Sequence, residues 1–118
     1  MSSKVSAYMQ NGVKHITISG TLEMFEMKTF KKNLYALCFA GDFSSVVVDM
    51  SGVKYIDSSG VGILVGFAKL IKNAGKHVVL VKLRPNVASL FHLAGLDEYL
   101  LDKKEKNNAN KSSLSGNF

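Results

Sequence analysis

Apolar and polar side chains alternate along residues 14–19, which predicts a strand with one buried face. Asn11-Gly12, just before this segment, is a dipeptide typical of a tight hairpin turn. Residues 6–9, on the other side of that turn, also suit a strand. The start of the chain is therefore expected to form an antiparallel hairpin.

Beyond residue 20, segments with the apolar spacing of helices alternate with short strands. Helical spacing runs from Met24 to Cys38, from Ile63 to Lys76 and from Pro85 to Ala94. Strands are predicted at Val46–Val48 and at His77–Leu83, the second of them as a central strand. The segment Leu96–Leu101 is expected to close the domain as a short helix or strand. Such alternation implies a mostly parallel sheet with right-handed crossovers. The predicted fold class is α/β, with a mixed, mostly parallel sheet of about four or five strands, the antiparallel hairpin at one edge, and about three or four packed helices.

Size and composition favour one globular domain. The chain has 118 residues, of which 47% are hydrophobic, and this is enough for a core. The domain is expected to span residues 1–102, and the polar residues 103–118 are expected to form a disordered tail. The sequence lacks an apolar run long enough to span a membrane and a segment typical of a signal peptide. The single Cys38 is expected to be a buried, unreactive thiol, which fits a reducing cytoplasm.

The net charge of +6 raises the question of a nucleic-acid partner. However, the lysines are scattered along the chain, Arg84 is the single arginine, and no nucleic-acid-binding motif is present. We therefore interpret the positive charge as an ordinary solvated surface and expect no direct contact with nucleic acid.

The stretch Asp57-Ser58-Ser59-Gly60 stands between a predicted strand and a predicted helix. Backbone N–H groups at a helix N-terminus are unpaired and carry a partial positive charge, so this junction suits a phosphate, either bound or covalently attached. The simpler hypothesis is an ordinary helix cap, because Asp and Ser are preferred there. One cap needs one side-chain oxygen, whereas three adjacent residues offer one here. Ser59 is expected to turn inward as the cap, which leaves the Ser58 hydroxyl facing outward.

Other candidate sites are weaker. Asp49 and Asp57 both follow the Val46–Val48 strand and are expected at the same edge of the sheet, where they could bind magnesium or, as we favour, accept hydrogen bonds from loop amides. Gly62 and Gly66 lie four residues apart on a helix, which permits close approach to another surface; the sheet is favoured over a partner. No nucleotide-binding, catalytic-triad or metal-binding motif is present, so no catalytic residue, metal site or cofactor is predicted.

The segment from Val47 to Gly62 resembles the signature of STAS domains, specifically that of the bacterial anti-sigma-factor antagonists. The resemblance extends to Gly20-Thr21-Leu22-Glu23, to Gly75-Lys76 and to Pro85-Asn86-Val87, and it covers about residues 5–101. It implies the STAS fold for this domain.

The resemblance also implies a phosphorylation switch. Antagonists of this family bind, in the unphosphorylated form, an anti-sigma factor that is also a serine kinase with a histidine-kinase-like ATPase fold, and this binding releases the sigma factor. The kinase then phosphorylates the serine directly after the Asp, which is Ser58 here, and a Ser/Thr phosphatase resets the switch. The implied phosphorylation loop and partner surface comprise Glu23, Asp57, Ser58, Ser59, Gly60 and Gly62.

Glu23 departs from the family pattern, which usually has Asp at this position. Since the Glu side chain is one methylene longer, we expect the departure to affect the efficiency of phosphorylation by the kinase more than the fold. The family reading implies a cytoplasmic regulator, monomer or weak dimer, without enzymatic activity of its own. The alternatives are a STAS regulatory module of a transporter or lipid-trafficking complex, or a stressosome scaffold.

Overall fold

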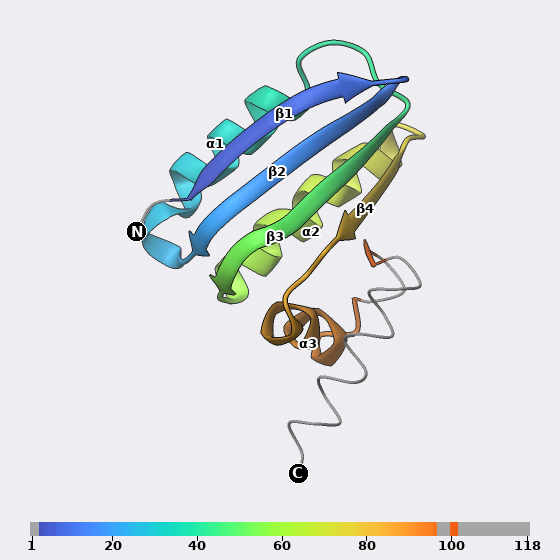
Figure 1. Cartoon of the computed structure of the whole chain (residues 1–118). Helices are drawn as coiled ribbons and strands as arrows, with labels where there is room; N and C mark the ends of the chain where they lie inside the picture. Colours follow the sequence, from blue (N-terminus) through green and yellow to red (C-terminus); the bar gives the residue numbers. More distant parts are fainter. Residues whose placement is uncertain (1–2, 97–99, 102–118) are drawn as a thin grey trace.

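A mixed four-stranded sheet organises the part of the chain that the computed structural model describes, residues 3–96 and 100–101 (Figure 1). The strand order is β1-β2-β3-β4, with β1 antiparallel to β2 and the other pairs parallel. The elements in chain order are β1 (Lys4–Gln10), β2 (Val13–Leu22), the 3-10 helix η1 (Met24–Glu26), α1 (Met27–Cys38), β3 (Ser45–Ile56), α2 (Ser58–Asn73), β4 (His77–Val81) and α3 (Pro85–Leu93). The predicted α/β class and the N-terminal hairpin are confirmed.

The hairpin turn has the backbone geometry that its dipeptide predicts. Asn11 and Gly12 have φ values of 52° and 79°. Positive φ at both central residues matches the right-handed twist of the flanking strands, and Asn-Gly adopts it at little cost. Gln10 therefore pairs directly with Val13, and β1 follows β2 in register as far as the Lys4–Ser19 pair.

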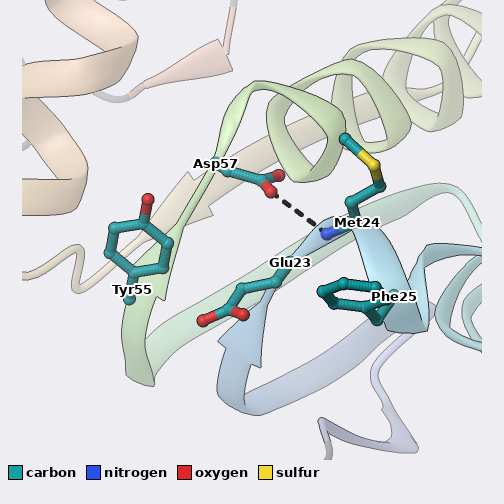
Figure 2. Close-up of a pocket in the computed structure, with 5 residues that line it drawn as sticks. All are labelled: Glu23, Met24, Phe25, Tyr55 and Asp57. Carbon is teal, nitrogen blue, oxygen red and sulfur yellow. Dashed lines mark hydrogen bonds between the residues drawn. The ribbon is translucent and has the colours of Figure 1, made fainter.

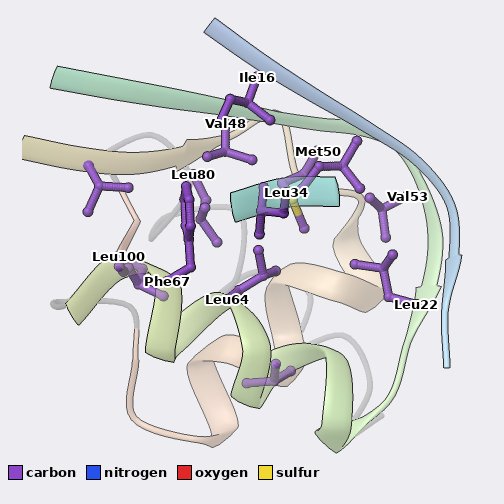
Figure 3. Packing of buried hydrophobic residues seen from close by; sticks show 14 of the residues in the cluster. Ile16, Leu22, Leu34, Val48, Met50, Val53, Leu64, Phe67, Leu80 and Leu100 are labelled. Carbon is purple, nitrogen blue, oxygen red and sulfur yellow. The ribbon is translucent and has the colours of Figure 1, made fainter. Parts of the chain in front are cut away.

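Helices α1 and α2 lie against one face of the sheet, and α3 lies near the carboxyl ends of β3 and β4 (Figure 1). In Figure 3, Leu64 and Phe67 of α2 point toward Val48 and Leu80 of the sheet. The largest fully buried side chains are Phe30, Phe67, Phe91, Ile16, Ile18, Leu22, Leu34, Met50, Leu64, Ile71, Leu80 and Leu100. Apart from Leu100, they come from the sheet and all three α-helices, so the elements share a single core that holds the carboxyl ends of β2 and β3 in place.

Two predictions about the strands were wrong. β3 runs to Ile56, well beyond the short predicted strand, and two register shifts against β2 accommodate the residues that follow Asp49. β4 lies at the edge of the described sheet and not at its centre. Beyond it, Leu101 makes an isolated parallel bridge with Leu80.

Lys14 is a buried polar residue on β2. Its Nζ donates to the carbonyl oxygens of Leu37 at 3.1 Å and Ala40 at 2.6 Å. These carbonyls lie at the carboxyl end of α1, where a cation is favoured by the helix dipole. The ammonium group thus ties the end of α1 to the sheet.

The expected tail, residues 103–118, lies outside the described residues, as do residues 97–99 of the segment expected to close the domain. Among the described helices, none is long and apolar enough to cross a membrane.

The thiol of Cys38 is expected to react slowly in the native protein. Cys38 is fully buried on α1, and this burial raises the pKa of the thiol to about 11. Because the thiolate is the reactive form, both access and ionisation oppose attack. A chromogenic thiol reagent should therefore label Cys38 rapidly only after denaturation. Rapid labelling of the native protein would show that this face of α1 is accessible.

Candidate functional site

The junction between β3 and α2 is organised by Asp57. This residue is the N-cap of α2, with φ −103° and ψ −177°, and its Oδ1 accepts hydrogen bonds from the backbone N–H groups of Ser59 at 2.9 Å and Gly60 at 3.1 Å. The prediction that Ser59 is the cap was therefore wrong. Asp57 is the cap because its backbone is extended, which is the conformation that brings a capping side chain within hydrogen-bond distance of the first helical amides.

The two serines of the junction are in different environments. Ser59 is half-buried, and its hydroxyl donates a hydrogen bond to Oδ1 of Asp57. Ser58 is exposed at the first position of α2. The helix cap is thus the Asp57 side chain, the Ser59 hydroxyl bonds to that same carboxylate, and Ser58 lies on the surface.

Asp57 also connects this junction to the end of β2. Its Oδ2 accepts a hydrogen bond of 3.1 Å from the backbone N–H of Met24, as Figure 2 shows, and its own N–H donates to the carbonyl oxygen of Leu22 at 3.1 Å. The hydrogen bond from the Ser59 hydroxyl, aided by those from the backbone amides, lowers the pKa of Asp57 from its usual value. The carboxylate is therefore charged at neutral pH and holds the η1 turn against the start of α2.

Two hollows lie beside Asp57, and one of them reaches Ser58. One, of about 500 Å³, is lined by Glu23, Met24, Phe25, Tyr55 and Asp57 (Figure 2). The other, of about 330 Å³, is lined by Tyr55, Ile56, Asp57, Ser58, Asn86 and Leu90. The structure thus brings Glu23 beside Asp57, as the resemblance implies.

Tyr55 and Asn86 are residues of this site that the sequence reasoning did not single out. Tyr55 lines both hollows, and the Asn86 side chain donates to the carbonyl oxygen of Lys54 at 3.0 Å. Each residue lies inside a motif that carries the resemblance to STAS domains, so that motif could have indicated both residues as part of the site.

The glycines of α2 differ in what surrounds them. A Cβ on Gly60 would lie 2.7 Å from a side-chain carbon of Ile56 and 3.0 Å from the carbonyl oxygen of Leu22, so this residue lets the helix approach the strands closely. Around Gly62 there is open space, and near Gly66 only the Tyr35 hydroxyl lies within 4 Å of such a Cβ. The favoured explanation for the pair Gly62 and Gly66, packing against the sheet, was therefore wrong.

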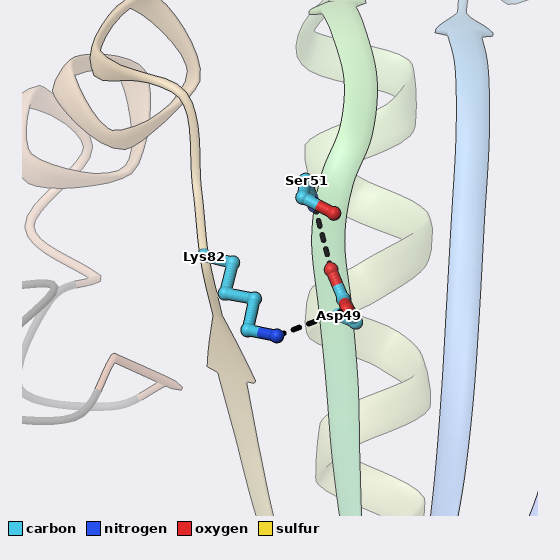
Figure 4. A network of polar contacts seen from close by, with 3 residues as sticks. All are labelled: Asp49, Ser51 and Lys82. Atoms are coloured by element: carbon cyan, nitrogen blue, oxygen red, sulfur yellow. Dashed lines mark hydrogen bonds and ion pairs between the residues drawn. The ribbon is translucent and has the colours of Figure 1, made fainter.

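Asp49 lies away from this site, in the middle of β3. Its Oδ1 accepts a hydrogen bond of 2.9 Å from the N–H of Ser51, and its Oδ2 lies 3.7 Å from Nζ of Lys82 (Figure 4). Partial burial acts to raise the pKa of Asp49, but the bonds from Ser51 and the charge of Lys82 lower it overall. The expected placement of Asp49 beside Asp57 was wrong, whereas a hydrogen bond to a nearby amide is confirmed.

Among residues 3–96 and 100–101, no three His, Cys, Asp or Glu side chains come together in a way that would hold an ion.

The family pattern described as STAS domain matches residues 4–110 of this chain. The chain belongs to the STAS domain family. Among characterised proteins, the anti-sigma F factor antagonist of Lysinibacillus sphaericus is 23% identical over 91 residues, covering 77% of this chain and 78% of that protein. The anti-sigma-B factor antagonist of Bacillus subtilis is 26% identical over 85 residues, covering 72% and 76%.

Solved structures show the same fold. The anti-sigma factor antagonist SpoIIAA in its unphosphorylated form superposes with a TM-score of 0.68 and 19% identity, covering 88% of this chain and 92% of that one. SpoIIAA of Bacillus in the phosphorylated form superposes with a TM-score of 0.63 and 18% identity, covering 88% and 96%. An anti-sigma factor antagonist from Mycobacterium paratuberculosis has a TM-score of 0.72 and 21% identity, covering 95% of each chain.

Alanine substitutions at Gly60 and Gly62 should have opposite effects on stability. Gly62→Ala should raise the free energy of unfolding by up to about 1 kcal/mol, because Ala favours a helix interior and meets no neighbour there. Gly60→Ala should lower it by about 1–3 kcal/mol, because the added methyl group collides with Ile56 and Leu22. Urea denaturation of both variants measures the difference. Equal effects would mean that α2 is not seated against β2 and β3 as described.

Proposed function

We propose that this chain is an anti-sigma factor antagonist whose partner binding is controlled by phosphorylation of Ser58. In the unphosphorylated form it binds an anti-sigma factor that is also a serine kinase, and the sigma factor is released. Phosphorylation switches this binding off. The observation that carries the proposal is the exposed Ser58 at the start of α2, beside a helix cap that does not use its hydroxyl.

The physical chemistry of the junction supports a switch that leaves the fold intact. A phosphoryl group adds about −1.5 to −2 charges and three acceptor oxygens. At a helix N-terminus this charge is favoured by the dipole and by nearby N–H groups. The phosphoryl group would also add charge and bulk in the middle of the binding surface, next to Asp57, where it would obstruct close contact with a partner. A loss of about 3 kcal/mol in binding would weaken the complex by roughly a hundredfold.

In this proposal the chain is a substrate and a binding protein, not an enzyme. The kinase, with its histidine-kinase-like ATPase fold, supplies ATP and the catalytic groups, and a Ser/Thr phosphatase removes the phosphate. The protein would act in the cytoplasm with these partners, without cofactor, metal or direct contact with nucleic acid, and as a monomer or weak dimer. The partner surface would include Glu23 and the loop from Asp57 to Gly62.

Phosphate is expected on Ser58 and not on Ser59. Ser58→Ala should abolish phosphorylation by the anti-sigma serine kinase of the same organism and leave a protein that binds that kinase permanently, whereas Ser58→Asp should bind poorly. The matched control, Ser59→Ala, should still be phosphorylated and should lose about 1 kcal/mol of stability with its hydrogen bond to Asp57.

Peptide mapping by mass spectrometry after reaction with the kinase and ATP identifies the modified residue. Phosphate on Ser59, or full phosphorylation of Ser58→Ala, would refute the assignment. If no such kinase phosphorylates the wild-type protein and size-exclusion chromatography shows large particles, the result would favour the stressosome alternative. A lack of phosphorylation without particles would favour a module of a transporter or lipid-trafficking complex.

The exposed face of α2 next to Ser58 is expected to contribute to partner binding. Gly62 is exposed with open space around it, so Gly62→Arg adds a large side chain to this surface without a clash inside the fold. We expect the variant to have an unchanged circular dichroism spectrum and at least tenfold weaker binding to the anti-sigma factor by calorimetry. Gly62→Ala is the matched control and should bind nearly normally. Unaltered affinity in folded Gly62→Arg would remove this part of α2 from the interface.

A further inference from the structure

Large, exposed apolar side chains lie close together beside Asp57, the residue that precedes Ser58. Phe25 is 96% exposed and Met24 is 72% exposed, although apolar side chains of this size are normally at least partly covered. Both lie on η1, and with Tyr55, itself 50% exposed, they line the hollow of about 500 Å³ that reaches Asp57 (Figure 2). The two residues of η1 are not part of the loop from Asp57 to Gly62 proposed above, which we call the switch loop.

The ring of Phe25 projects between two hollows. The second hollow, of about 160 Å³, is lined by Ser3, Phe25, Glu26 and Thr29. All charged side chains that line these two hollows within the described residues are acidic, namely Glu23, Glu26 and Asp57, whereas the chain as a whole has a net charge of +6. An aromatic residue surrounded by acidic groups suits a partner surface with an apolar pocket bordered by basic side chains.

The η1 turn is also held rigidly to the switch loop. Oδ2 of Asp57 accepts the hydrogen bond from the N–H of Met24, while Oδ1 caps α2 beside Ser58. A protein that reaches Ser58 to phosphorylate it therefore meets η1 in a fixed position. A backbone turn that is already fixed loses little entropy on binding, which favours η1 as the place of an anchor.

We propose that Phe25, supported by Met24 and Tyr55, is the apolar anchor by which the anti-sigma kinase binds this chain. The kinase provides an apolar pocket bordered by basic residues for the ring. This inference rests on the proposed function and adds a contact on η1 to the surface formed by the switch loop and α2. Because η1 is separate from Ser58, the anchor determines affinity for the kinase and not the chemical step.

The experiment measures binding and Ser58 phosphorylation with the anti-sigma serine kinase of the same organism, using the full chain. Phe25→Ala should weaken binding by about thirtyfold and raise the KM for phosphorylation similarly, with kcat unchanged. Phe25→Leu should restore most of the affinity, because it keeps an apolar side chain. All variants should keep the wild-type melting temperature, since the ring contributes little to the core.

Met9→Ala is the matched control. Met9 is 44% exposed and lies on β1 near the hairpin turn, at the other end of the sheet from Asp57, so this variant should behave as wild type. Normal affinity and KM in Phe25→Ala, with Ser58 still phosphorylated, would overturn the anchor and leave the proposed function intact. Absence of phosphorylation in the wild-type protein would instead refute the proposed function, and the anchor with it.

Discussion

Asp57 connects three parts of the chain through its carboxylate and its backbone N–H, and the geometry of the site depends on these bonds. One oxygen caps α2 and the other binds the N–H of Met24 at the start of η1, while the backbone N–H of Asp57 pairs with Leu22 at the end of β2. Each bond alone contributes modestly, and a charged acceptor makes each stronger than a neutral pair. Together they hold the switch loop and the η1 turn in one arrangement, with Gly60 allowing the close approach that the bonds require.

This arrangement gives one end of the molecule a character that differs from the rest. Acidic and apolar groups gather around Ser58, on a chain whose overall charge is positive. A surface of this kind attracts a partner with basic groups at long range and selects it by apolar contact at short range. The hydrophobic core beneath it is shared by the sheet and three helices, so a modification at the surface need not disturb folding.

Local chemistry explains which parts of the structure could be predicted from the sequence. Asn11-Gly12 specifies its turn through backbone conformation alone, and the run of polar residues after Ile56 predicts a helix start, so both were found. The identity of the cap could not be found this way, because three adjacent residues are all suitable and only the extended backbone of Asp57 decides between them. The surroundings of Gly62, the burial of Lys14 and the length of β3 could not be predicted either. Each depends on which parts of the chain lie nearby in space, and the periodicity of the sequence does not contain that information.

The hydrogen bonds at Asp57 also limit the chemistry that this residue can perform. Oδ1 accepts from the N–H of Ser59, from the Ser59 hydroxyl and from the N–H of Gly60, which exhausts its lone pairs, and Oδ2 faces Met24. A carboxylate with a lowered pKa is also a weak proton acceptor. Although it is adjacent to Ser58 in sequence, Asp57 is thus poorly suited to act as a general base toward that hydroxyl. Under the proposed function, the groups that activate the serine must therefore come from the kinase and not from Asp57.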